Sequence, residues 1–293
     1  MKLMALDGIV LEHRDLQVEA GDEGVRLHCV QAGEGPLVVL LHGFPDFWYG
    51  WRRQIPALVH AGFRVVVPDQ RGYATSSKPA GVSAYGVRTL AQDVDQLIHA
   101  LGEESAHLVG HDWGAGVAWA TAMAHPERVR RLAILNGPHP KRFIEALKNP
   151  VQLAKSYYMF LFQLPWLPEQ ILGADRFSML VRALRDEPTR EGAVTEADLA
   201  LYREAWSQPG ALTTMIHWYR AMFRGEAVPV QRTEVDALVV WGVKDRHLGH
   251  DLAAPSPDLV PNARVVFVPN ATHWIQHDDP ARVSDELIAF FRG

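Results

Sequence analysis

The chain has 293 residues, enough for one large α/β domain or for two domains of ordinary size. Hydrophobic residues make up 48% of it and charged residues 22%, a globular composition that excludes disordered, collagen-like and coiled-coil chains. The formal net charge is −5, and no stretch concentrates Lys or Arg as phosphate binding requires, so we expect no nucleic-acid partner.

Short apolar runs rich in β-branched residues recur along the chain and predict buried strands. In chain order they cover residues 36–41, 63–67, 106–109, 129–135, 238–241 and 265–268. Helical patterns separate them, such as residues 88–101, in which apolar side chains recur on one face and Gly102 ends the helix. This alternation predicts a mostly parallel, doubly wound sheet with right-handed crossovers.

The alternation stops near His139. From there to residue 225 no buried-strand run occurs, whereas helical periods do, for example at residues 199–206 and 211–223. We therefore expect a sheet domain and an inserted helical cap. The sheet domain is predicted to comprise residues 1–138 and 226–293, and the cap residues 139–225. Ligands of open parallel sheets bind beyond the carboxyl ends of the strands, so the segments after the strands are the candidate site.

Gly110-His111-Asp112-Trp113-Gly114 follows the predicted strand at residues 106–109 and precedes a helix of small residues. The layout is that of a nucleophile elbow with Asp in place of Ser, in which the glycines permit a sharp turn that raises the central side chain above the sheet. On this pentapeptide alone, an Asp112 that caps the following helix is the more frequent interpretation. Other strand ends must therefore decide between the two.

Two later strands are also followed by residues suited to catalysis. Asp245 follows the strand at residues 238–241, and His273 follows the strand at residues 265–268. Taken singly, Asp245 could form a turn and His273 could begin a helix. An acidic nucleophile, a second acid and a histidine, each after its own strand, nevertheless reproduce the chain order of the triad in α/β hydrolases.

His42-Gly43-Phe44-Pro45 follows the strand at residues 36–41. A tight glycine turn exposes backbone N–H groups that can point at a developing oxyanion. The second donor of such a hole is the N–H of the residue after the nucleophile, here Trp113. The backbone amides of Phe44 and Trp113 are therefore the predicted oxyanion hole.

Taken together, several segments resemble the epoxide hydrolases of the α/β-hydrolase superfamily, with haloalkane and fluoroacetate dehalogenases as close relatives. The segments are HGFPDFWYGW, DQRGYATSSKP, GHDWGAGVAWATAMAHPERV, WGVKD and NATHWIQHDDP. The resemblance covers residues 27–133 and 236–293 and implies an α/β-hydrolase fold with an inserted helical cap. It also implies that Asp112 is the nucleophile, that His273 is the general base, and that Asp245 orients His273.

The chemical identity of the nucleophile predicts the reaction class. A carboxylate that attacks a saturated carbon forms an alkyl ester, which water can cleave at the enzyme's own carbonyl; a serine would form an ether that this machinery could not cleave. Asp112 therefore predicts attack at an sp3 carbon, followed by hydrolysis with water that His273 activates. Epoxides and alkyl halides both offer such a carbon.

Tyrosines of the cap favour the epoxide, because ring opening develops an alkoxide that needs a proton or a strong hydrogen bond. The segments SYYMFLFQLP and HWYRAM resemble the two cap segments that carry the ring-opening tyrosine pair of epoxide hydrolases. Their alignment selects Tyr158 and Tyr219, with Tyr157 as the alternative to Tyr158. The expected substrate contacts are Trp113, Tyr157, Trp218 and Trp274, and the expected substrate is a small apolar or aromatic epoxide that reacts with water.

Two other functions stay open at this point. Trp113 occupies the position whose indole binds halide in haloalkane dehalogenases, so a dehalogenase with the same aspartate nucleophile is the main alternative. Phe44 weakens it, because its side chain cannot donate to a halide. A ligand receptor without turnover is the second alternative, since this fold alone does not establish catalysis.

No cofactor and no metal are expected. His247 and His250 lack a third ligand at a suitable spacing, so we interpret them as solvated loop residues. The single cysteine, Cys29, and the early acidic residues predict a cytoplasmic protein. The longest uncharged aromatic stretch, residues 156–168, is too short for a membrane helix. Both a monomer and a homodimer are compatible with the sequence.

Overall fold

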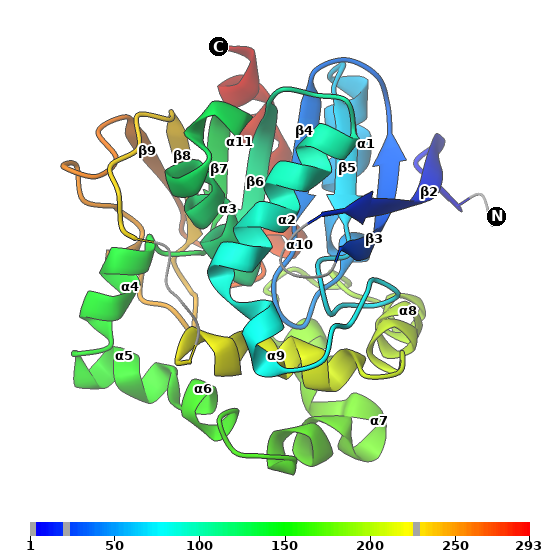
Figure 1. The fold of residues 1–293 in the computed structure, drawn as a ribbon, viewed down its shortest axis with the longest axis vertical. Helices are drawn as coiled ribbons and strands as arrows, with labels where there is room; N and C mark the ends of the chain where they lie inside the picture. The colour runs from blue at the N-terminus through cyan, green and yellow to red at the C-terminus, as the bar shows by residue number, and fades with distance from the viewer. Residues whose placement is uncertain (1–3, 20–23, 225–228) are drawn as a thin grey trace.

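The structure, a computed structural model, describes residues 4–19, 24–224 and 229–293 (Figure 1). Its centre is a sheet with the strand order β1-β2-β3-β5-β4-β6-β7-β8-β9. Strands β1 to β3 are antiparallel to their neighbours, and β4 to β9 pair in parallel. The strands are β1 (Met4–Leu6), β2 (Ile9–Val18), β3 (Val25–Ala32), β4 (Leu37–Leu41), β5 (Arg64–Pro68), β6 (Ala106–His111), β7 (Val129–Leu135), β8 (Ala237–Gly242) and β9 (Ala263–Val268).

The six strands predicted from apolar runs are confirmed as β4 to β9. Central strands such as β4 are buried along their whole length, because helices cover both faces of a parallel sheet. Strand β9 differs from the prediction: it lies at the edge of the sheet, and its Phe267 is 48% exposed. Strands β1 to β3 were not predicted. β2 is largely exposed and polar, so it lacks the apolar signal of a covered strand.

Helices pack on the two faces of the sheet, as right-handed crossovers require (Figure 1). Helices α2 and α3 contact each other on one face, and α1 and α11 contact each other on the opposite face. The core helices are α1 (Gln54–His60), α2 (Val87–Ala100), α3 (Trp113–Ala124), α10 (Ile275–Asp278) and α11 (Pro280–Arg292). Short 3-10 turns are η1 (Trp48–Trp51), η2 (Val82–Tyr85), η3 (Pro126–Arg128) and η4 (His250–Leu252).

Between β7 and β8, the described residues form six further helices, a cap in the lower half of Figure 1. They are α4 (Pro140–Ala146), α5 (Pro150–Lys155), α6 (Tyr157–Leu161), α7 (Leu167–Asp186), α8 (Glu196–Trp206) and α9 (Ala211–Met222), and α7 is interrupted by non-helical residues at 174–177. The cap faces the carboxyl ends of the strands, since the indole of Trp218 in α9 donates to the carbonyl of Arg71, after β5 (3.0 Å). The division at residues 139 and 225 stays a prediction, and residues 225 and 226 lie outside the described residues. No described helix is long and apolar enough to cross a membrane.

Buried hydrogen bonds join the cap to the loop after β4. The Tyr202 hydroxyl of α8 donates to Asp46 Oδ1 (2.8 Å), and the Trp206 indole donates to the carbonyl of Pro45 (2.6 Å). The backbone N–H of Phe47 also donates to Asp46 Oδ1 (2.8 Å). Asp46 is only 2% exposed, and this burial raises its pKa to about 6, although its hydrogen bonds and Arg52 act in the opposite direction.

We expect the buried charge of Asp46 to make the protein less stable as pH rises. A carboxyl group whose pKa is higher in the folded than in the unfolded protein stabilises the fold in its protonated form. This contribution is fully present below the pKa of the unfolded state, near 4, and is lost as the pH rises through the folded pKa of about 6. Asp46→Asn keeps an oxygen acceptor for Tyr202 and removes the charge. It should therefore raise the free energy of unfolding in urea by up to about 3 kcal/mol at pH 8, and by about half as much at pH 5. Equal effects at both pH values would contradict a buried charge at this position.

Candidate active site

Asp112 lies in the sharp turn between β6 and α3. Its φ of 53° and ψ of −119° are rarely adopted by non-glycine residues, and such strain costs about 1–3 kcal/mol. The flanking glycines allow the close approach: a Cβ on Gly110 would lie 2.3 Å from the carbonyl oxygen of Gly114, and one on Gly114 would lie 2.2 Å from that of Leu41. The Asp112 side chain makes no capping hydrogen bond to α3, so the helix-cap interpretation is wrong.

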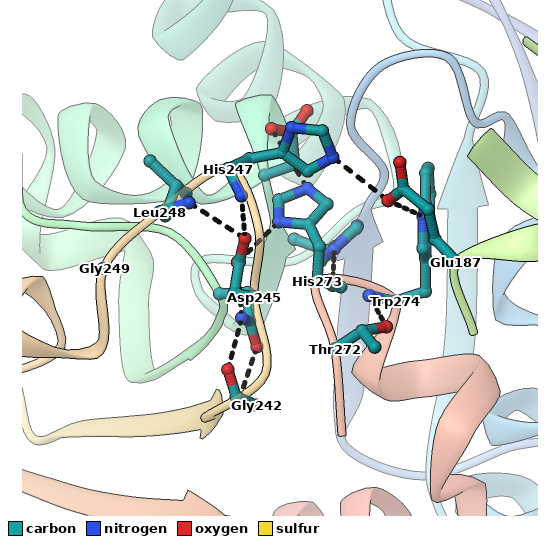
Figure 2. Close-up of polar contacts among 12 residues, drawn as sticks. Glu187, Gly242, Asp245, His247, Leu248, Gly249, Thr272, His273 and Trp274 are labelled. Carbon is teal, nitrogen blue, oxygen red and sulfur yellow. Dashed lines mark hydrogen bonds and ion pairs between the residues drawn. The ribbon is translucent and has the colours of Figure 1, made fainter. Parts of the chain in front are cut away.

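His273 lies between two carboxylates. Its Nε2 is 3.5 Å from Asp112 Oδ2, and its Nδ1 is 2.8 Å from Asp245 Oδ2, a contact drawn in Figure 2. The three residues follow β6, β8 and β9, whose carboxyl ends meet at one edge of the sheet. The tertiary structure therefore brings together the nucleophile, acid and histidine candidates that the chain order suggested.

Asp245 is held by donors on both of its oxygens. The backbone N–H groups of His247 and Leu248 donate to Oδ1 at 2.7 and 2.9 Å, as Figure 2 shows. The Asn136 amide donates to Oδ2 at 2.7 Å. Burial alone would raise the pKa of Asp245, but His273 and these donors lower it to about 2. Asp245 is therefore held as a carboxylate within hydrogen-bond distance of the His273 imidazole.

The pKa of His273 is raised and that of Asp112 is lowered because the two side chains face each other. Burial alone would lower the pKa of His273, but Asp245 and Asp112 raise it well above the usual value for histidine. Burial alone would raise the pKa of Asp112, yet His273 and the amide of Phe44 lower it. Both shifts favour an ionised Asp112 carboxylate, the form that can attack carbon.

The turn after β4 directs a backbone amide at Asp112. The N–H of Phe44 donates to Asp112 Oδ1 at 2.7 Å. A Cβ on Gly43 would lie 2.3 Å from the same oxygen, so only glycine permits this approach. Trp113 is the first residue of α3, and the N–H groups of a first helical turn have no partner within the helix. Both amides predicted for an oxyanion hole thus belong to residues beside Asp112.

A cavity of about 410 Å³ opens above Asp112 between the core and the cap. Asp112, Trp113, Tyr158, Trp218 and Tyr219 line it, so five of the predicted residues meet there. The rings of Tyr158 and Tyr219 have centroids 5.8 Å apart. Burial, reinforced by the charge of Asp112, raises the pKa of both phenols above the usual value for tyrosine. They therefore stay protonated and can donate hydrogen bonds into the cavity.

Two predicted substrate contacts do not line this cavity. Tyr157 is 65% exposed, because consecutive residues of a helix point in different directions and Tyr158 takes the inward one. Trp274 is buried instead: it is 2% exposed, and its indole donates to Glu187 at 3.2 Å. Its place after His273 could not reveal this partner, which comes from the cap.

The structure adds three residues to the site that sequence reasoning missed. Asn136, at the end of β7, joins Asp245 to Gly242. Glu187, at the end of α7, accepts from His247 Nε2 at 3.0 Å as well as from Trp274 (Figure 2). The ring centroid of His247 lies 5.3 Å from that of His273, so its interpretation as a solvated residue needs correction. The Asn136-Gly137 pair directly after a predicted strand could have indicated Asn136 from the sequence. No such signal marks Glu187, because it lies 60 residues before its partner His247.

The residues that the structure describes contain no group of three or more His, Cys, Asp or Glu side chains that could hold a metal ion. The arrangement of Asp112, His273 and Asp245 is instead suited to acid–base and nucleophilic chemistry with the side chains themselves.

Comparison with known proteins agrees with this fold. The α/β-hydrolase fold family matches residues 36–280. An AB hydrolase superfamily protein of Bacillus subtilis, YfhM, is 43% identical over 92% of this chain and 95% of its own length. Human epoxide hydrolase 4 is 36% identical over 94% of this chain and 78% of its own length. A crystal structure of Bacillus megaterium epoxide hydrolase with an inhibitor superposes with a TM-score of 0.86, at 33% identity, over 94% of this chain and all of that one. The chain therefore belongs to the α/β-hydrolase superfamily and, within it, to the epoxide hydrolases.

Proposed function

We propose that this protein hydrolyses an apolar epoxide to a vicinal diol through an alkyl ester on Asp112. The observation that carries the proposal is one largely apolar cavity lined by Asp112, which lies in a strained turn, and by Tyr158 and Tyr219. Its relatives include proteins named as epoxide hydrolases. We also propose residues 139–225 as the cap and a cytoplasmic location.

In the first step, Asp112 Oδ2 attacks a ring carbon while the bond from that carbon to the ring oxygen breaks. We assign attack to Oδ2 because Oδ1 accepts from the amide of Phe44 and is held as the future ester carbonyl. Tyr158 and Tyr219 hydrogen-bond to the ring oxygen, and one of them transfers its proton to the alkoxide. A hydroxyalkyl ester and a tyrosinate result.

In the second step, His273 takes a proton from water, and the hydroxide adds to the ester carbon of Asp112. The oxyanion forms on Oδ1, where the amides of Phe44 and Trp113 stabilise it. Collapse expels the diol oxygen, which takes the proton held by His273. The proton left on the Asp112 carboxyl group passes to the tyrosinate, which restores the Asp112 carboxylate and the tyrosine. Ester formation also removes the Asp112 charge, one of the two that raise the pKa of His273, so this pKa falls and more of the imidazole is in the neutral form that can take a proton from water.

Replacing Tyr158 and Tyr219 together by Phe should lower the rate of ring opening by about 10²–10⁴-fold, the range of general acid catalysis. The alkoxide would then form without a proton donor. Stopped-flow or steady-state diol formation from styrene oxide measures the loss. Tyr157→Phe is the matched control, because the neighbouring phenol is exposed, and it should leave the rate unchanged. A fully active double variant would show that neither tyrosine takes part in ring opening.

A paired screen distinguishes the epoxide hydrolase from the dehalogenase alternative. Trp113, whose equivalent binds halide in haloalkane dehalogenases, lines the cavity and is the observation that favours that alternative. Diol formation from a panel of epoxides and halide release from a panel of haloalkanes are measured with the same enzyme. Halide release without diol formation would identify a dehalogenase, whereas binding of epoxides without turnover would identify a receptor.

A further inference from the structure

The cavity continues well past Asp112 along helix α3. Its lining includes Trp113, Gly116, Ala120 and Met123, which are spaced three or four residues apart and therefore lie on one face of the helix. At 1.5 Å per residue, residues 113–123 span about 15 Å. The cavity is thus an elongated channel whose inner part holds Asp112.

Small residues keep this channel open. Gly116 lies one turn beyond Asp112, and a Cβ built on it would meet no atom within 4 Å. Glycine in a helix interior is unfavourable, so space rather than local backbone geometry is what this residue provides. Ala120, one turn further along, also lines the cavity and contributes only a methyl group there; it is 1% exposed. Side chains of helices lean towards the N-terminus, so a larger residue at 120 would fill the space over Gly116.

The channel reaches solvent through apolar side chains. Ile144 of α4 is 56% exposed, Phe223 after α9 is 45% exposed, and Val230 is 41% exposed, and all three line the cavity. Among the described residues that line it there is no Lys, Arg or His, and Asp112 is the only acid. A charged group inside the channel would lose its hydration without gaining a partner.

We infer that the substrates are neutral epoxides with a long, unbranched hydrocarbon substituent that lies along α3, while the epoxide ring meets Asp112. The inference rests on the proposed function and adds a substrate class to it. Each methylene removed from water contributes about 0.8 kcal/mol, which corresponds to about a fourfold gain in kcat/KM. The gain should continue with chain length until the channel is filled.

A series of 1,2-epoxyalkanes from four to twelve carbons tests the inference, with kcat/KM measured below the solubility limit of each compound. For the wild type we expect kcat/KM to rise severalfold per methylene over several members. Ala120→Leu should end this rise, with a loss of about 10–100-fold for the long members and less than threefold for epoxybutane. Gly116→Ala, whose new Cβ has open space, should narrow the same place and shift the profile in the same direction.

Ala124→Leu is the matched control, because Ala124 ends the same helix but is exposed and does not line the cavity. Its profile should equal that of the wild type. An epoxide that carries a terminal carboxylate within the channel length should react at least tenfold more slowly than the neutral epoxide of equal length.

The possible failures are distinguishable. Diol formation that is independent of chain length, or equal losses for short and long epoxides in Ala120→Leu, would overturn the channel while leaving epoxide hydrolysis intact. A wild type that forms no diol from any member would overturn the proposed function together with the inference.

Discussion

Replacing Asp112 by Ala is expected to lower kcat/KM for epoxides by at least about 10⁴-fold, as for the loss of a triad nucleophile or its partner. The reason is that no other carboxylate lines the cavity among the described residues. Diol formation measures the loss. Asp258→Ala, at an exposed position, is the control for an aspartate-to-alanine change and should retain full activity.

Isotope labelling tests the covalent step on Asp112 directly. In a single turnover in H₂¹⁸O, water attacks the ester carbon, so the label should enter the carboxyl group of Asp112 and not the diol. Mass spectrometry of the peptide that contains Asp112 locates it. Label found only in the diol would mean that water attacks the epoxide directly, and the two-step scheme would be wrong.

Replacing His273 by Gln should separate the two steps. Without His273, burial raises the pKa of Asp112, but the N–H of Phe44 still lowers it, so we expect a reactive carboxylate to remain near pH 7. Ester formation should therefore proceed, whereas its hydrolysis should slow by about 10²–10⁴-fold for want of a general base. Intact-protein mass spectrometry should then show the enzyme enlarged by one epoxide.

Two controls make the His273 result specific. His60→Gln, on an exposed residue at the end of α1, should hydrolyse epoxides at the wild-type rate and accumulate no ester. The double variant Asp112→Ala/His273→Gln should show no added mass. Unchanged steady-state turnover in His273→Gln would exclude this histidine as the base.

Contacts between Glu187 and the two core loops show how the cap joins the site. Glu187 accepts from His247, in the loop that carries Asp245, and from Trp274, which follows His273. Thr189 adds a hydrogen bond from its hydroxyl to the carbonyl of Asn270 at 2.8 Å. The end of α7 therefore fixes the loops after β8 and β9 relative to each other, and with them the distance between Asp245 and His273.

Much of the fold could be predicted because it depends on local patterns. The runs that became β4 to β9 are apolar enough to be recognised one at a time, and the connecting helices follow from periodicity. Strands β2 and β3 could not be found in this way, because β2 alternates with many exposed residues and is held by pairing with β3. Cross-strand pairing depends on two segments together, so the sequence of either segment alone indicates it only weakly.

The sequence by itself determined the parallel strands β4 to β9, the inserted cap and the order of Asp112, Asp245 and His273, since glycine turns and apolar runs act over a few residues. Only the tertiary structure decided that Tyr158 rather than Tyr157 faces the cavity, that Glu187 binds His247, and that the cavity extends along α3. Each of these depends on side chains from segments far apart in the chain, which take their positions only when the cap and the core pack together.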